Sequence, residues 1–108
     1  MKLPSLAEIE AAGEIVYELI RASSQLSWPI LNERAGVELW IKHENHNPAG
    51  AFKVTGGMIQ VGRLKECLVD CLGVCCATHG NQGQSVAFAA GQHGISATTV
   101  VPLGNSPD

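Results

Sequence analysis

The sequence predicts an α/β protein built on a partial parallel sheet with flanking helices. Two continuous apolar runs, at residues 71–77 and 97–101, contain cysteine and β-branched residues, which is typical of strands buried on both faces of such a sheet. Helical and loop segments separate these runs from each other and from an earlier strand-like run at residues 37–42. This order of strand, helix, strand, loop, helix and strand indicates a parallel α/β layer.

The first element is a helix expected over residues 6–22. Ser5 followed by Glu8 matches a capping box, in which each residue satisfies a backbone N–H of the other. The apolar residues that recur at helical spacing after it are Leu6, Ile9, Ala12, Val16, Leu19 and Ile20. We expect residues 23–29 to end this helix, because Ser-Ser and Trp-Pro favour non-helical backbone.

The remaining elements follow from the same patterns. In chain order they are a strand at residues 37–42, a helix at 52–66, a strand at 71–77, a helix at 84–93 and a strand at 97–101. The turn-forming run at residues 45–50 precedes the second helix, and residues 78–83 form the loop before the third. The chain then stops at a helix start signal, with Ser106 as cap and Pro107 at the first helical position. We therefore expect the chain to be truncated.

Composition excludes several classes of protein. The 108 residues are 45% hydrophobic with a formal net charge of −3, as expected for one soluble globular domain or a piece of one. The slight acidity does not favour a nucleic-acid partner. No apolar run reaches the roughly 18 residues of a membrane span, and the N-terminus lacks the apolar stretch of a secretory signal. We expect a cytoplasmic protein without a membrane partner.

Four cysteines lie close together in the sequence. They are Cys67, Cys71, Cys75 and Cys76. Zinc sites usually pair C-x2-C knuckles or add well-spaced histidines, and neither pattern is present, so no metal site is expected. Adjacent residues of a strand such as Cys75 and Cys76 point to opposite faces, which disfavours shared ligation. We expect buried, reduced thiols that act as small apolar residues. A redox switch stays open as an alternative that no pattern supports.

Lys53 is the first candidate for chemistry. It follows a glycine-containing loop, one turn inside the expected helix, with Phe52 as its neighbour. A lysine drawn out of water beside an aromatic ring loses its preference for the charged form, which frees its amine to attack an aldehyde. On local sequence alone, a solvated surface lysine is the simpler interpretation.

The second candidate is the loop that follows the strand at residues 71–77. It lies at the carboxyl end of that strand, where open α/β sheets bind ligands. Gly80 and Gly83 allow backbone N–H groups to approach a ligand closely, and the following helix start favours an anion. The glycine spacing matches neither the dinucleotide fingerprint nor a Walker loop. By itself, the pattern is better explained as an ordinary connection between strand and helix.

Together, the two candidates resemble one enzyme family. The first motif is Lys42-x-Glu44-Asn45-x-x-Pro48-x-Gly50-Ala51-Phe52-Lys53, and the second is Thr78-His79-Gly80-Asn81-Gln82-Gly83-Gln84. They resemble the cofactor-lysine motif and the substrate-and-cofactor loop of fold type II pyridoxal-phosphate enzymes. The threonine/serine dehydratase and serine racemase branch is the most similar. Trp28-Pro29-Ile30-Leu31 stands where this family usually has Thr-Pro-Leu. The resemblance covers essentially the whole chain in the family's order.

The resemblance implies a fold, a cofactor and roles for individual residues. The fold is the N-terminal part of the tryptophan synthase beta-like fold, and the cofactor is pyridoxal 5'-phosphate. Lys53 is similar to the Schiff-base lysine that also moves protons at the substrate α-carbon. Asn81 is similar to the residue that bonds the ring hydroxyl oxygen of the cofactor, and Phe52 to a residue that packs near it. The loop that grips the substrate carboxylate corresponds to Thr78, His79, Gly80, Asn81 and Gln82.

The implied activity is that of an ammonia-lyase (dehydratase) of threonine/serine-like hydroxy-amino acids, or a racemase of the same branch. A small amino-acid substrate and a homo-oligomeric assembly are implied with it. The chain departs from the family at Ala49, Ala51, Thr55 and Gln82. In the family, the glycine-rich loop that cradles the phosphate comes later than residue 108, so we expect weak cofactor binding and negligible turnover. The alternative is a non-catalytic truncated homologue that acts as a small self-associating α/β module through uncovered strands.

Overall fold

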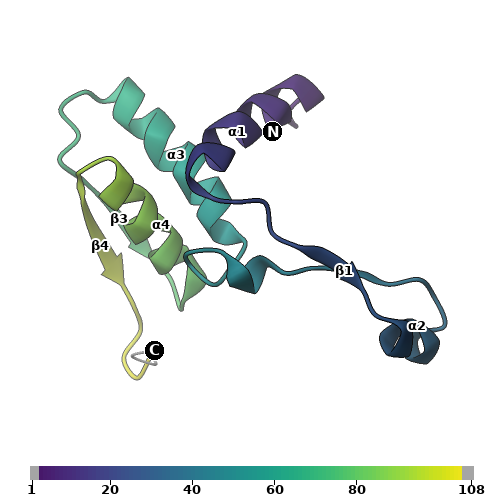
Figure 1. The fold of residues 1–108 in the computed structure, drawn as a ribbon. Helices are drawn as coiled ribbons and strands as arrows, with labels where there is room; N and C mark the ends of the chain where they lie inside the picture. Colours follow the sequence, from purple (N-terminus) through teal and green to yellow (C-terminus); the bar gives the residue numbers. More distant parts are fainter. Residues whose placement is uncertain (1–2, 106–108) are drawn as a thin grey trace.

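A computed structural model describes residues 3–105 (Figure 1). In chain order the elements are α1 (Leu6–Leu19), β1 (Gln25–Ser27), α2 (Pro29–Ala35), β2 (Trp40–Lys42), the 3-10 helix η1 (Glu44–His46), α3 (Lys53–Cys67), β3 (Gly73–Ala77), α4 (Asn81–Gln92) and β4 (Ser96–Val100). Helices and a small parallel sheet together confirm the predicted α/β class. None of the described helices is both long and apolar enough to cross a membrane. The helix start signal at Ser106 and Pro107 lies outside the described residues.

The strands form two separate pairs. β3 and β4 run parallel, with Cys76 opposite Thr99, and α4 is the crossover between them. β1 and β2 run antiparallel, with Leu26 opposite Ile41. The expectation that the strand at 37–42 joins a parallel layer was therefore wrong. Its ordered part begins only at Trp40 and pairs with β1, a strand that the local pattern did not predict because three residues are too few to show a period.

Two helix boundaries near the N-terminus differ from expectation. α1 begins as predicted by the capping box: the Glu8 N–H donates to Ser5 Oγ at 3.3 Å, and the Ser5 N–H donates to Glu8 Oε2 at 2.7 Å. It ends at Leu19 instead of residue 22, because the backbone of Ile20 turns to an extended conformation and buries that side chain. The short helix α2 was missed, since Pro29 occupies its first turn and starts the helix that it was expected to prevent.

The core lies where α3 packs between α1 and α4 (Figure 1). Its buried side chains are Val16, Ile20, Val54, Met58, Val61 and Ala89. Val54, in the first turn of α3, and Ala89, near the end of α4, have no exposed surface, so the contact between these two helices is the best-packed part of the described chain. Small residues on α4 let it approach α3 closely. Because of this close contact, the first turns of the two helices lie near each other.

The parallel strands are less buried than the sequence indicated. All five residues of β4 are exposed, and β3 alternates between exposed and partly buried positions. α4 covers one face of this pair, whereas Gly73, Cys75 and Ala77, at the exposed positions of the alternation, are not covered by any described element. The expectation of strands buried on both faces was therefore wrong for the described residues. Apolar composition indicates the capacity for burial, but burial also needs a second covering layer.

The cysteines also differ from expectation. All four thiols are free, but Cys67 and Cys75 are exposed and Cys71 and Cys76 are only partly buried, so they are not core residues. The reason is the same one-sided covering of β3, together with the position of Cys67 at the exposed end of α3. Within residues 3–105, no group of three or more His, Cys, Asp or Glu side chains could hold a metal ion.

The segment β1–α2–β2 extends away from the three packed helices (Figure 1). It carries many of the exposed large apolar side chains, which include Leu26, Trp28, Ile30, Leu31, Val37, Leu39 and Trp40. Its internal order comes from the side chain of Asn32, which donates to Ser27 Oγ at 2.8 Å and accepts from the Leu39 N–H at 2.9 Å. The segment is thus a defined structure with an apolar surface and not an irregular loop.

Candidate active site

Asn47 organises the loop that leads into Lys53. Its Oδ1 accepts from the N–H groups of Ala49 at 3.2 Å and Ala51 at 3.1 Å, and its Nδ2 donates to the Ala51 carbonyl at 2.7 Å. Gly50 lies between these residues with φ 61°, a left-handed conformation that favours glycine. One side chain therefore supplies the backbone partners that the turn itself lacks, and it delivers the chain to the start of α3 in a defined direction.

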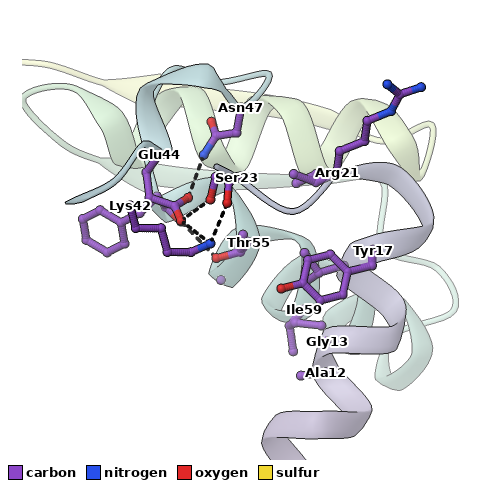
Figure 2. A pocket seen from close by; sticks show the side chains of 14 residues that line it. Ala12, Gly13, Tyr17, Arg21, Ser23, Lys42, Glu44, Asn47, Thr55 and Ile59 are labelled. Carbon is purple, nitrogen blue, oxygen red and sulfur yellow. Dashed lines mark hydrogen bonds and ion pairs between the residues drawn. The ribbon is translucent and has the colours of Figure 1, made fainter. Parts of the chain in front are cut away.

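Glu44 links this loop to the segment after α1. Its Oε1 accepts from Ser23 Oγ at 2.7 Å and lies 3.5 Å from Lys42 Nζ, while its Oε2 accepts from Asn47 Nδ2 at 3.2 Å. Figure 2 shows this cluster on the wall of a hollow of about 450 Å³ between α1, the loop and α3. The Ser23 hydrogen bond, aided by those from Asn47 and Lys42 and by the charge of Lys42, holds the pKa of Glu44 below its ordinary value, against the opposing effect of partial burial.

Lys53 is the first residue of α3, with Phe52 at the N-cap position. The interpretation in which Lys53 lies one turn inside the helix and is drawn out of water beside Phe52 was wrong, and the simpler interpretation of a solvated lysine agrees with the structure. The Lys53 side chain is exposed, and Phe52 is itself 63% exposed. At the first position of a helix a side chain leaves the end of the cylinder instead of packing along it, so one neighbouring ring cannot enclose it.

The amine of Lys53 differs from the other described lysine amines in having no partner. Lys42 Nζ donates to the Ser23 carbonyl at 3.3 Å and pairs with Glu44, and Lys65 Nζ donates to the carbonyls of Val69 at 3.2 Å and Cys71 at 3.1 Å. Among residues 3–105 the structure records no hydrogen bond or ion pair of the Lys53 amine. Of the described lysine amines, the one of Lys53 can therefore react with an aldehyde without breaking an existing contact.

The start of α4 supplies the second part of the site. α4 begins at Asn81 and not at residue 84, so Asn81 and Gln82 lie in its first turn and the preceding loop is shorter than expected. No side chain caps this helix. The Gly80 N–H is taken by Thr78 Oγ1 at 3.1 Å and the Gly83 N–H by the Gly80 carbonyl at 2.8 Å. The free N–H groups of the first turn and the helix dipole make this end attractive to an anion such as a carboxylate.

The starts of α3 and α4 meet at one hollow. It has a volume of about 340 Å³, and its wall includes Phe52, Lys53, Gly57 and Gln82. The Ser85 hydroxyl of α4 donates to the Lys53 carbonyl at 2.6 Å, which ties the two helix starts together. The structure thus brings Gln82 to the same hollow as Phe52 and Lys53, although it is far from them in the sequence.

The other predicted site residues lie beside this hollow and not on its wall. Asn81 precedes Gln82 in the first turn of α4 and is exposed. Thr78 is partly buried, and His79 and Gly80 are exposed in the short loop before α4. All of them lie at or just before the amino end of α4. Gln82 lines the hollow from this same end of the helix.

Sequence reasoning missed three residues that position this site: Asn47, Gly57 and Ser85. A signal for Asn47 was available, because asparagine in a turn often bonds backbone groups a few residues further on. Gly57 and Ser85 had no local signal. Their importance comes from the contact between α3 and α4, which no periodicity within either helix specifies.

The residues present fit pyridoxal phosphate in three respects. The hollow has the size of a small-molecule site, for which volumes of about 300–1,000 Å³ are usual. A lysine amine without a partner stands at its edge, as an aldehyde cofactor requires. The uncapped starts of α3 and α4 surround it with a positive electrostatic environment that suits anionic groups.

Comparison with known proteins identifies the family. A family model described as "Pyridoxal-phosphate dependent enzyme" matches residues 16–108, so the chain belongs to the pyridoxal-phosphate-dependent enzymes. Within the family it is similar to threonine dehydratases and serine racemases, as the sequence motifs predicted. Pyridoxal phosphate is the cofactor of these relatives.

Three relatives illustrate this similarity. The chain is 36% identical over 94 residues to threonine dehydratase 1 of Solanum lycopersicum, which covers 86% of the chain and 15% of that protein. It is 33% identical over 106 residues to the serine racemase of Homo sapiens, covering 96% of the chain and 31% of the racemase. The structure of maize serine racemase matches with a TM-score of 0.88 at 26% identity, covering 98% of this chain and 32% of that one. The chain thus spans at most about a third of these relatives' lengths.

Proposed function

We propose that this chain carries the cofactor lysine, Lys53, and the substrate-binding helix start of a pyridoxal-phosphate-dependent ammonia-lyase. The observation that supports this most directly is which of the described lysine amines already have a hydrogen-bond or ion-pair partner. Lys42 and Lys65 are occupied by intramolecular contacts, whereas Lys53 is unpaired at the edge of a hollow that Gln82 also lines. The family membership supplies the cofactor, and this arrangement supplies one lysine suited to hold it.

The proposed roles of the residues are those that the family resemblance implies. When bound, the cofactor supplies an electron sink that makes the α-proton of an amino acid removable. Lys53 would hold the cofactor through its amine and would move the proton at the substrate α-carbon. Asn81 would bond the ring hydroxyl oxygen, and Phe52 would pack near the ring. The substrate carboxylate is bound by the start of α4 and the residues before it, namely Thr78, His79, Gly80, Asn81 and Gln82.

The proposed substrates are threonine, serine and similar hydroxy-amino acids, from which β-elimination removes the hydroxyl group as water, after which hydrolysis of the resulting aminoacrylate gives an oxo acid and ammonia. The names of the relatives support this class, since they include dehydratases that act on threonine and racemases that act on serine. The exposure of Lys53 and Phe52 has a further consequence for the chain as described. Water reaches the amine freely, so the cofactor is expected to bind weakly and to be released readily.

The test is reductive labelling. The chain is mixed with less than one equivalent of pyridoxal phosphate, reduced with borohydride, and digested for peptide mass measurement. We expect the adduct to concentrate on Lys53, with little on Lys42 or Lys65. Lys53→Arg keeps the positive charge and should abolish the preferred adduct, whereas Lys65→Arg should leave it unchanged. Labelling spread evenly over the described lysines in the unmodified chain would refute the proposal.

A second function is favoured by the exposed surface of β4. All five of its residues are exposed, and an uncovered strand edge invites pairing with another chain. On this alternative the chain is a non-catalytic module that self-associates. Sedimentation velocity over a hundredfold concentration range, roughly 1–100 µM, separates the two, because such weak edge pairing falls in this range of affinity. Association without selective Lys53 labelling would favour the module over the enzyme.

A further inference from the structure

Ser85 is the one fully buried polar side chain among the described residues, with 0% of its surface exposed. It lies one helical turn after Asn81 on α4 and faces the first turn of α3. A buried hydroxyl is stable only with a hydrogen-bond partner, and here the partner is the carbonyl oxygen of Lys53 at 2.6 Å. The bond therefore acts on the main chain of the residue that carries the amine of the proposed site.

Gly57 makes this hydrogen bond possible. It lies on α3 one helical turn after Lys53, and a Cβ atom at this position would overlap Ser85 Oγ and approach the Ser85 carbonyl oxygen to 3.0 Å. The two helices thus touch through backbone and a single small side chain. A second glycine, Gly83, lets α4 lie against the strands, since its Cβ would be 2.8 Å from Thr99 Cγ2. The first two turns of α4 are therefore in close contact with α3 on one side and with the strands on the other.

Val54 in the first turn of α3 packs into the core, but among the described residues no other hydrogen bond joins this turn to α4. No side chain caps it, and its first residue, Lys53, is exposed. Uncapped helix ends fray, because their first N–H groups have no partners and their residues gain conformational freedom on opening. The Ser85 hydroxyl is the recorded hydrogen bond that joins this turn to the rest of the described core.

We infer that Ser85 is a positioning residue for Lys53: its hydroxyl holds the first turn of α3 so that the Lys53 amine faces the first turn of α4 across their shared hollow. This inference rests on the proposed role of Lys53. Without the hydroxyl the amine still exists and α3 still packs through its middle, but the amine samples more directions. Its advantage over the other lysines in reacting with an aldehyde then falls.

The test compares the share of adduct on Lys53 between variants under the same labelling conditions. Ser85→Ala removes the donor and keeps the Cβ. We expect the ratio of Lys53 adduct to Lys42 and Lys65 adduct to fall about fivefold, the size of effect expected for one hydrogen bond of ordinary strength. Val16→Ala is the matched control, because Val16 is a buried core residue on α1 whose loss destabilises the chain without touching the shared hollow. It should leave the ratio unchanged at an equal folded fraction, as measured by circular dichroism.

The possible outcomes are distinct. No preference for Lys53 in the unmodified chain overturns the proposed function itself. A preference that persists unchanged in folded Ser85→Ala overturns the positioning role while leaving the proposed function intact. A loss of preference in Val16→Ala equal to that in Ser85→Ala also overturns it, because the effect would then follow stability alone. If Ser85→Ala does not fold, Ser85→Cys decides by the same ratio, since a thiol keeps a weaker donor and should give an intermediate value.

Discussion

Asn47 and Ala51 are joined by two hydrogen bonds: Asn47 Oδ1 accepts from the Ala51 N–H at 3.1 Å, and Asn47 Nδ2 donates to the Ala51 carbonyl at 2.7 Å. The side-chain amide of Asn47 thus bonds both backbone groups of Ala51, as a neighbouring strand would, and closes the loop that ends at Lys53. Since Glu44 also accepts from Asn47, the loop is connected to the segment after α1. Asn47 therefore helps to determine the direction in which α3 begins.

Asn47→Ala should destabilise the chain by about 1–3 kcal/mol, because it removes several partly buried hydrogen bonds and leaves backbone groups of the loop unsatisfied. The measurement is urea unfolding followed by circular dichroism. The matched control is Asn45→Ala, an exposed asparagine of the same turn, which should change stability by less than about 0.5 kcal/mol. Equal effects of the two substitutions would contradict the role assigned to Asn47.

Gly57→Ala should destabilise the chain by about 1–3 kcal/mol, because the added methyl group overlaps Ser85 and forces α3 and α4 apart. The adjacent Gly56 provides the control. An added Cβ there meets no atom within 4 Å, so Gly56→Ala should stabilise α3 by about 0.5–1 kcal/mol through its higher helix propensity. Opposite signs from adjacent glycines would be hard to explain except by the helix contact. Two changes of the same sign would argue against it.

The stability of the chain should depend on pH through Glu44. The Ser23 hydrogen bond lowers the pKa of Glu44 in the folded chain, so the unfolded chain binds more protons at acidic pH. The corresponding stability is complete above the ordinary glutamate pKa of about 4.3 and is lost as the pH falls through the lower folded value. Glu44→Gln should flatten this dependence in urea unfolding between pH 6 and 3, the range in which glutamates titrate. Ser23→Ala should flatten it partly, and an unaltered slope in Glu44→Gln would exclude Glu44 as the source.

The thiols should react in two classes. Cys67 and Cys75 are exposed, whereas Cys71 Sγ donates to the Gly73 carbonyl at 3.3 Å and Cys76 Sγ lies 3.7 Å from Thr99 Oγ1. We expect two fast and two slower reactions with a disulfide reagent under native conditions, and uniform rates in denaturant. Peptide mapping after brief alkylation assigns the fast class. Four equal native rates would mean that the partial burial of Cys71 and Cys76 does not limit access.

The family and its motifs were accessible from the sequence because they depend on residue types at short spacings. The capping box of Ser5 and Glu8 was predictable for the same reason, since both partners lie within one turn. β1 and α2 were not predictable in this way. β1 is three residues long, and its order comes from pairing with β2 and from the contacts of Asn32. Such interactions join residues of different segments, and the local pattern around one residue does not indicate its partner.

Only some features of Lys53 and its environment were predictable from the sequence. Its identity as the candidate lysine comes from the motif around it, and its position at the start of α3 comes within a residue of the expected boundary. Its exposure agrees with the simpler local interpretation, but its unpaired amine was not predictable, because that depends on which side chains reach the helix end. The Lys42 amine is occupied by the Ser23 carbonyl from the segment after α1, and the Lys65 amine by carbonyls just after α3, so only the folded chain distinguishes them from Lys53.

By itself, the sequence determined the α/β class, the family, the candidate cofactor lysine and the presence of a loop before α4, because all of these are expressed in local composition and spacing. The tertiary structure alone decided that Lys53 and Gln82 share one hollow and that Ser85 bonds the carbonyl of Lys53. It also decided that β3 and β4 are covered on one face. The physical reason is that these features arise from the packing of α4 against α3 and the strands, where Gly57 and Gly83 permit close approach. Close packing between distant segments is set by the shapes of both surfaces, and neither segment encodes it separately.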